Sequence, residues 1–226
     1  MRTLRQTHTS LGTPSGNPLS AAAIDWHNLP LFPLGTVLFP GGVLPLRVFE
    51  ARYVDMMRER MKAEQPFGVC LIKDGAEVGG PAVPFEIGCL ASIVDFDMLQ
   101  PGILNIRTHG GARFRVLETR NEADGLVRAN AEAVSDDAKL PLPAEFSQCA
   151  QMLRAILPKL PGGLVRTPHQ FDDAAWVSNR LAEILPIQAL AKQRLMALTA
   201  PLMRLEIIHK YVTQQGLNNS QARNPW

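Results

Sequence analysis

The sequence predicts an α+β fold in which a small antiparallel β barrel, closed or half-closed, with one packed helix precedes a helical bundle. Three observations predict it. Residues 29–46 contain no charged side chain, but proline or glycine interrupts them every few positions, which favours short strands over a long helix. Counting the opening segments, six or seven strand patterns occur up to about residue 134. Beyond residue 143 the apolar residues recur at helical spacing.

The barrel is expected to begin with three short extended segments. They are Leu29–Leu34, Val37–Phe39 and Val43–Phe49, joined by turns at residues 35–36 and 40–42. From Phe49 onward, apolar side chains recur every three or four residues. This spacing predicts an amphipathic helix near residues 50–62 that packs back on the sheet.

A series of further strands is expected between residues 66 and 134. The predicted strands are Pro66–Lys73, Ile87–Leu99, Ile103–Thr108, Ala112–Arg120 and Leu126–Val134. Turn sequences separate the last four, at Pro101-Gly102, at Gly110-Gly111 and at Asp124-Gly125. Because short turns join them, these strands are expected to pair with their neighbours as antiparallel strands.

The charged and proline-bearing segment 135–143 ends the strand pattern. Four amphipathic helices are expected after it, at 144–157, 174–185, 188–198 and from Pro201 to just before Gly216. Leu202, Leu205, Ile208 and Val212 form the predicted apolar stripe of the fourth. The predicted organisation is a flexible tail at 1–27, a barrel subdomain at 28–135, a bundle subdomain at 144–215 and a frayed tail at 216–226.

Composition excludes several classes of protein. The formal net charge of the 226 residues is only +2, so no overall electric field draws the chain to nucleic acid or to an anionic membrane. Cys70, Cys89 and Cys149 stand far apart among apolar residues, which predicts reduced thiols in the core. The polar beginning of the chain has no apolar segment typical of a signal peptide, and a cytoplasmic location is expected.

Several strings resemble the Lon protease amino-terminal domain family. LPLFPL, VLFPG and PLRVFEARY, within residues 29–53, resemble that domain's opening, with Arg47 where the family usually has His. Ile87–Ala91, Arg113–Val116 and the helical strings RLAEILPI, KQRLMALTAP and RLEIIHKY extend the resemblance to about residues 28–214. The resemblance implies a PUA-like β pseudobarrel followed by helices. It also implies a non-catalytic protein that binds polypeptide, in a substrate-recognition or adaptor-like role.

Nothing in the sequence predicts an enzyme. A G-x-x-x-x-G-K-[ST] phosphate loop is absent, and so are the ATPase and Ser/Lys protease domains of full-length Lon proteins. The five histidines are scattered without metal-ligand spacing. Asp95 with Asp97, and the pairs at 136–137 and 172–173, are interpreted as surface, loop and capping acids. We therefore expect no catalytic residue, no metal and no cofactor.

Two sets of side chains are candidates for binding. Aromatic and charged residues near the start of the barrel are the candidate peptide-binding set: Phe32, Phe39, Phe49, Glu50, Arg52 and Tyr53. Arg107, Arg113, Arg115 and Arg128 are the alternative set, a basic stripe on strands adjoining the Gly110-Gly111 turn that would bind RNA or another anion. Surface pairing with nearby glutamates is the structural alternative for these arginines.

The expected partners follow from these sets. Polypeptide clients come first, a homo-oligomer is a further expectation, nucleic acid is less favoured, and a membrane is not expected. A PUA-like RNA-binding module and a small-molecule binder remain the two alternative functions.

Overall fold

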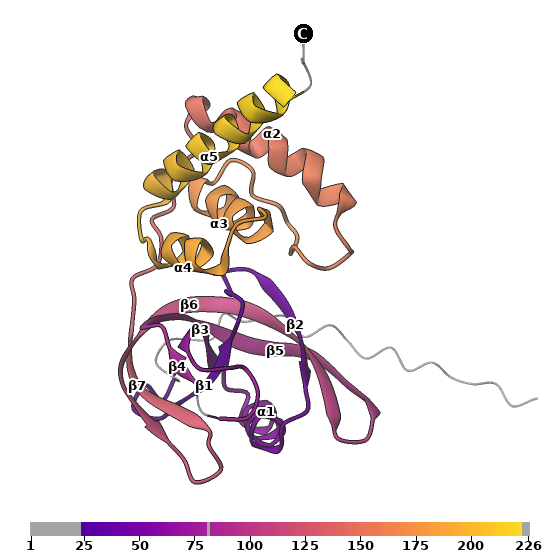
Figure 1. Ribbon diagram of the computed structural model, residues 1–226, viewed down its shortest axis with the longest axis vertical. Coiled ribbons are helices and arrows are strands. Elements are labelled where there is room, and N and C mark those ends of the chain that lie inside the picture. The colour runs from indigo at the N-terminus through magenta and orange to yellow at the C-terminus, as the bar shows by residue number, and fades with distance from the viewer. Residues whose placement is uncertain (1–23, 81, 223–226) are drawn as a thin grey trace, which may run out of the picture.

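The computed structural model describes residues 24–80 and 82–222, with side chains described for all of these except Leu99 and residues 215–222. It is a mixed α/β fold (Figure 1). The strands are β1 (Leu29–Leu34), β2 (Val43–Val48), β3 (Phe67–Asp74), β4 (Val83–Pro84), β5 (Ile87–Gln100), β6 (Ile103–Asn121) and β7 (Val127–Ala133). The α-helices are α1 (Ala51–Ala63), α2 (Ser147–Ile156), α3 (Ala174–Ile184), α4 (Ala189–Ala197) and α5 (Pro201–Ala222).

The strands form one sheet in the order β1-β7-β6-β5-β3-β4, and β2 pairs with β6. Of the pairings in the described chain, only β1 with β3 is parallel, and it joins Leu31–Leu34 to Gly68–Leu71. Because β1 pairs with both β7 and β3, the strands β1, β7, β6, β5 and β3 form a continuous ring of pairings. The parallel pair requires a crossover between β1 and β3, and β2 with α1 supplies it.

The helix predicted near residues 50–62 is α1, and it packs on the sheet. Its buried residues Tyr53, Met56 and Met57 join a core with Val48 and Phe67. Methionine fills irregular space well because its side chain is unbranched and flexible. This first core fixes the positions of β1, β2 and α1, which carry or adjoin every candidate peptide-binding residue except Phe39.

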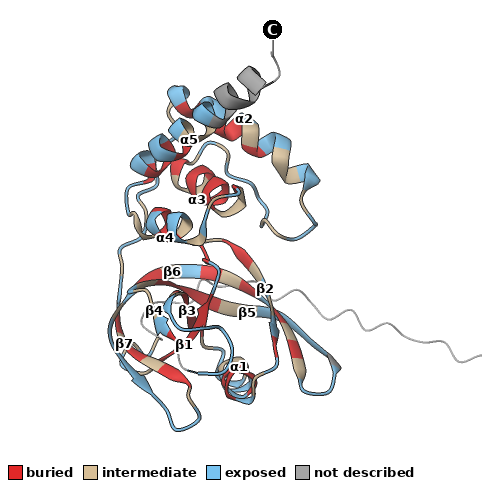
Figure 2. Ribbon diagram, in the orientation of Figure 1, coloured by how far each residue is buried: buried red, intermediate tan, exposed pale blue. Residues whose placement is uncertain are grey.

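The helices after residue 143 share a second core. Leu153, Val177, Leu181, Leu205 and Ile208 are among its most buried members, each with no more than 1% of its surface exposed. Figure 2 shows that α3 is buried along most of its length. In Figure 1 the helices α2 to α5 lie together on one side of the sheet, and α1 lies at its opposite end.

A buried ion cluster joins the sheet to these helices. Asp137, in the connection between β7 and α2, accepts hydrogen bonds from Arg113 on β6 at 2.5 Å and from Arg204 on α5 at 2.8 Å. The side chains of Arg113 and Arg204 are 1% and 0% exposed. Arg113 also donates to the carbonyls of Met196 and Ser135. One carboxylate therefore holds three parts of the chain together.

The predicted turn at Gly110-Gly111 is wrong, because β6 runs without interruption from Ile103 to Asn121. Gly110 instead lets another part of the backbone cross the strand. A Cβ atom on Gly110 would lie 2.1 Å from the carbonyl oxygen of Phe39. Gly110 also exchanges backbone hydrogen bonds of 2.9 Å with Gly41 and Gly42. Gly110 thus allows the backbone of residues 39–42 to approach β6 closely, and it does not form a turn.

Other boundaries also differ from the prediction. Residues 37–39 form a buried loop and not a strand, because Phe39 enters the core of the helices. The two-residue strand β4 was not predicted. The helix α5 continues past Gly216 to Ala222, and residues 223–226 of the predicted frayed tail lie outside the described residues.

The predicted N-terminal tail, residues 1–27, lies mostly outside the described residues, which begin at Ile24. At its described end, the carbonyl of Trp26 accepts a hydrogen bond of 2.8 Å from the amide of Ala131 on β7. Trp26 also packs against a small cluster of buried residues on the sheet. The described end of the predicted tail is therefore attached to the sheet.

Candidate functional site

The candidate peptide-binding residues converge in part on a groove between β1, β2 and the start of α1, which we call the barrel groove. Its volume is about 250 Å³. Its lining includes four of the six predicted residues: Phe32, Phe49, Glu50 and Tyr53. Phe32 and Tyr53 form the buried floor, with ring centroids 4.3 Å apart, while Phe49 is 55% exposed. An exposed phenylalanine beside a groove is a typical anchor for an apolar ligand.

Glu50 and Arg52 fix the corner where β2 ends and α1 begins. Arg52 donates to the Glu50 carboxylate at 2.7 Å and to the carbonyl of Gly125 at 3.1 Å. Its guanidinium also lies 4.8 Å from the centroid of the Tyr53 ring. Burial raises the pKa of Tyr53, while the positive charge of Arg52 opposes that change. Arg52 is thus engaged within the protein, and it does not line the groove.

Phe39 lies elsewhere. Its side chain is fully buried and belongs to the core of the helices. The sequence grouped it with Phe32 because the two lie close in the chain. The loop at residues 35–42 directs Phe39 to the opposite side of the sheet from α1, so it is not a surface residue of the barrel groove.

The four arginines of the basic stripe are not neighbours on one surface. Arg113 is buried in the ion cluster, where burial tends to raise the pKa of Asp137 but the hydrogen bonds and charges of Arg204 and Arg113 outweigh it and lower that pKa. Arg115 lies 3.4 Å from Glu132, and Arg128 contacts Glu59 and Glu122 at 3.5 and 3.4 Å. Arg107 is exposed on β6, opposite Asp95 of β5. Three of the four charges therefore have acidic partners.

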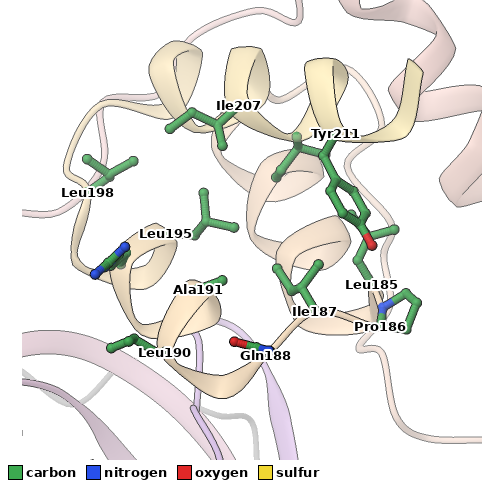
Figure 3. Close-up of a pocket in the computed structure, with 12 residues that line it drawn as sticks. Leu185, Pro186, Ile187, Gln188, Leu190, Ala191, Leu195, Leu198, Ile207 and Tyr211 are labelled. Carbon is green, nitrogen blue, oxygen red and sulfur yellow. The ribbon is translucent and has the colours of Figure 1, made fainter. Parts of the chain in front are cut away.

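A larger groove, which the sequence reasoning missed, lies between α4, α5 and the segment that joins α3 to α4. We call it the helical groove (Figure 3). Its volume is about 600 Å³. The residues that line it are Leu185, Pro186, Ile187, Gln188, Leu190, Ala191, Arg194, Leu195, Leu198, Ile207, Ile208 and Tyr211. Arg194 is the charged residue among them, and this lining includes no acidic side chain.

The side chains of the helical groove face one another across open space. In Figure 3, Ile207 and Tyr211 of α5 lie opposite Ile187 and Leu195. Leu190 and Ile207 are 43% and 45% exposed. A groove with exposed aliphatic walls and few polar groups is suited to apolar side chains of a ligand.

A signal for the helical groove exists in the sequence of α5. The helix carries apolar residues on two faces, and a helix that is apolar on several sides is usually covered on several sides. Leu205 and Ile208 face the core, whereas Met203 and Ile207 are 52% and 45% exposed. Leu202, which the sequence predicted to be in the buried stripe, is 39% exposed.

Within the described residues, the cysteine thiols are not placed to act as nucleophiles. The three thiols are buried and form no disulfide. Burial raises the pKa of Cys70 and of Cys149, and it raises the pKa of Cys89 to about 12. Burial, with the charges of Arg166 and Arg107, lowers the pKa of His109.

The described residues form neither a cluster of metal ligands nor a membrane-spanning helix. Within residues 24–80 and 82–222, His, Cys, Asp and Glu side chains form no group of three that could hold a metal ion. Over the same part of the chain, no helix combines the length and the apolar character that crossing a membrane requires.

Comparison with known proteins gives one consistent result. Residues 28–214 match the profile of the ATP-dependent protease La (LON) substrate-binding domain. Lon protease of Anaeromyxobacter dehalogenans is 25% identical over 188 residues, which cover 80% of this chain and 22% of the relative. Protein cereblon of Danio rerio is 32% identical over 113 residues, 48% of this chain and 26% of the relative. The chain thus spans about a quarter of the length of these relatives.

Solved structures share the fold. The Lon N-terminal domain protein from Xanthomonas campestris is 37% identical, with a TM-score of 0.69, and the match covers 81% of this chain and 98% of that one. The N-terminal domain of Mycobacterium avium complex Lon protease is 13% identical, with a TM-score of 0.57 over 82% of this chain and 98% of that one. The second likeness concerns the fold alone.

Proposed function

Because this chain belongs to the ATP-dependent protease La (LON) substrate-binding domain family, we propose that it binds polypeptide segments rich in apolar side chains. The observation that carries the proposal is the helical groove, an exposed apolar surface with a volume of about 600 Å³. A folded client hides its apolar side chains, whereas an unfolded or partly unfolded client presents them. Such a groove therefore selects for the folding state of a client more than for its sequence.

The energetics suit weak and reversible binding. Each large apolar side chain that becomes fully buried contributes roughly 1.5–3 kcal/mol. The loss of rotational, translational and chain freedom offsets part of that gain for a flexible ligand. Three anchored side chains, roughly 4.5–9 kcal/mol before that loss, are then expected to give a Kd on the order of 10 μM, which corresponds to about 7 kcal/mol. A client held this loosely can be passed on.

The barrel groove is the second proposed contact for the same clients. Phe49 at its mouth offers one exposed aromatic anchor, and Phe32 and Tyr53 form its floor. It is smaller than the helical groove, at about 250 Å³. We expect it to hold one or two side chains of a segment and to contribute less affinity.

Fluorescence anisotropy with a labelled, permanently unfolded polypeptide tests the proposal. Ile207→Asp places a charge in the helical groove, and Phe49→Asp places one at the barrel groove. Leu117→Asp is the matched control, because Leu117 is 55% exposed on β6 and lines neither groove. We expect Ile207→Asp to weaken binding roughly tenfold or more, since burying an unpaired carboxylate is unfavourable, and Leu117→Asp to leave it unchanged.

The result also separates the two grooves. If Phe49→Asp were the one variant that weakened polypeptide binding, the barrel groove would be the principal site. Equal binding by all four proteins, or no binding by the unmodified chain at ~100 μM, about ten times the expected Kd, would exclude polypeptide binding at these surfaces.

Several finer proposals accompany this one. We propose an adaptor-like role without catalysis, which the match of residues 28–214 to a substrate-binding domain supports. We also propose that residues 28–135 are a PUA-like pseudobarrel and residues 144–215 a helical bundle. The ring of strand pairings and the separate helical core support that division. The cytoplasmic location and a homo-oligomer stay predictions.

RNA binding by the arginine stripe remains the rival function. It predicts affinity that falls steeply with salt concentration, because cations would be released from the phosphates. Polypeptide binding in apolar grooves predicts little salt dependence. One salt titration with each ligand therefore distinguishes the two.

A further inference from the structure

The strand β5 has a free edge. It pairs with β6 along most of its length, but on its other side it pairs with β3 only at Cys89–Ala91. In the described structure, no strand adjoins that other side over residues 93–100. Figure 1 shows the β5–β6 hairpin extending away from the rest of the sheet. Such an edge presents unpaired backbone N–H and C=O groups to any extended chain.

One face of this free edge is apolar. Directly opposite residues of antiparallel strands lie on the same face, so Leu46 of β2, Ile106 of β6 and Phe96 of β5 form a row. Ile106 is buried, but Phe96, at the end of the row, is 61% exposed. Met98, two residues further along β5, is 46% exposed. The apolar row therefore ends at the free edge of β5, where the side chains of a further strand would cover Phe96.

The opposite face of the edge is acidic. Asp95 and Asp97 alternate with the apolar residues, and both are exposed. Asp95 lies opposite Arg107, and Asp97 accepts a hydrogen bond of 2.8 Å from Asn105. The positive charge of this face thus lies on strands further into the sheet, such as Arg107 on β6. In residues 93–100 of β5, the two aspartates are the charged side chains.

We propose that residues 93–100 of β5 accept an extended polypeptide strand whose side chains alternate between apolar and basic. Backbone hydrogen bonds to the free edge supply a binding mode that does not depend on sequence. Apolar side chains of the added strand pack against Phe96 and Met98, and basic ones pair with Asp95 and Asp97 across the new strand pair. This surface lies outside both grooves, and its role does not depend on them.

A second copy of the chain fits the edge poorly. Antiparallel self-pairing centred on Phe96 would place Asp95 of each copy opposite Asp97 of the other. Like charges directly opposite each other destabilise a strand pair. A basic partner removes the electrostatic obstacle.

Three synthetic peptides test the proposal on the full chain, with binding followed by anisotropy and by backbone amide signals in NMR. The first alternates valine and lysine, the second alternates valine and glutamate, and the third is the first with two adjacent central amides N-methylated. We expect the first to bind and to shift amides within residues 93–100. The second is expected to bind roughly tenfold more weakly or worse, because its charges repel. Adjacent N–H groups of an extended peptide point to opposite edges, so the third peptide lacks a donor whichever edge faces β5. It is expected not to bind.

Two variants complete the test. Phe96→Lys, at an exposed position, is expected to abolish binding of the valine–lysine peptide, while Leu117→Lys and Ile207→Asp leave it unchanged. Loss of binding in Ile207→Asp would place the peptide in the helical groove and overturn the proposal without affecting the proposed function. Amide shifts confined to residues outside 93–100 would overturn it too. A dimer of the free chain that Phe96→Lys dissociates would assign the edge to a second copy instead.

Discussion

Replacing Asp137 with asparagine tests the most consequential contact in the fold. The side chain of Asp137 is 7% exposed, and it neutralises two arginine side chains that are almost completely buried. Asparagine keeps the shape but removes the negative charge and one acceptor. Hydrogen bonds to charged groups contribute roughly 1.5–3 kcal/mol each, and the two shortest that this carboxylate accepts come from Arg113 and Arg204.

The expected loss is smaller than the sum of those two bonds. Carbonyl oxygens of Met196 and Ser135 still accept from Arg113, and that of Leu195 still accepts from Arg204. Removing one partner of a buried ion pair usually costs 3–5 kcal/mol, so with these acceptors retained we expect Asp137→Asn to lower the free energy of unfolding by about 2–4 kcal/mol.

Urea denaturation followed by circular dichroism measures that loss. The matched control is Asp136→Asn, because Asp136 is the exposed neighbour, and we expect a change within about 0.5 kcal/mol. The folded-state pKa of Asp137 is lowered, so its stabilising effect is complete at neutral pH and is lost as the pH falls below about 4. Asp137→Asn should lack that part of the loss of stability at low pH. Equal stability of the two variants at pH 7 would refute the assignment of Asp137 as the charge that joins the sheet to the helices.

Two further predictions follow from close packing. Gly110→Ala should destabilise the protein by roughly 3 kcal/mol or more, because its Cβ would meet the Phe39 carbonyl at 2.1 Å and backbone must move. Gly111→Ala, whose Cβ would lie 3.6 Å from Leu90, should change stability by less than about 1 kcal/mol, and similar melting temperatures for both would contradict the crossing at Gly110. The three buried thiols should not react with a disulfide reagent at pH 8 in the folded protein and should all react in denaturant, since burial raises the pKa of each. Rapid labelling of the native chain would show that the cores open.

The sequence predicted the local elements well where the pattern itself has a physical cause. Proline in Leu29–Leu34 is compatible with a short strand but not with a helix interior, and β1 has those bounds. The helical spacing of Tyr53, Met56 and Met57 gave α1, and the resemblance to the Lon amino-terminal domain was confirmed over residues 28–214. Within the candidate site, Phe32, Phe49, Glu50 and Tyr53 were placed together because the corner between β2 and α1 is a local structure.

Prediction failed where the cause lay far away in the chain. A Gly-Gly pair between strand patterns is typical of a turn, and only the crossing of residues 39–42 over Gly110 explains why the strand continues. The arginine stripe failed as a surface for the same reason. Arg113 and Arg115 lie on the same face of one continuous strand, but the helices cover Arg113, which donates to the carbonyl of Met196, while Arg115 remains exposed.

The order of strands and helices and the apolar faces of most elements were therefore determined by the sequence alone, because strand and helix periodicity depends on neighbours a few residues away. Tertiary structure decided which charges are buried and where grooves remain. Asp137 meets partners 24 and 67 residues distant, and the helical groove is formed by side chains from α4, α5 and the segment before α4. No local pattern encodes how two distant segments pack against each other. That packing decides whether a buried charge such as Asp137 is neutralised and whether an apolar groove remains open to a ligand.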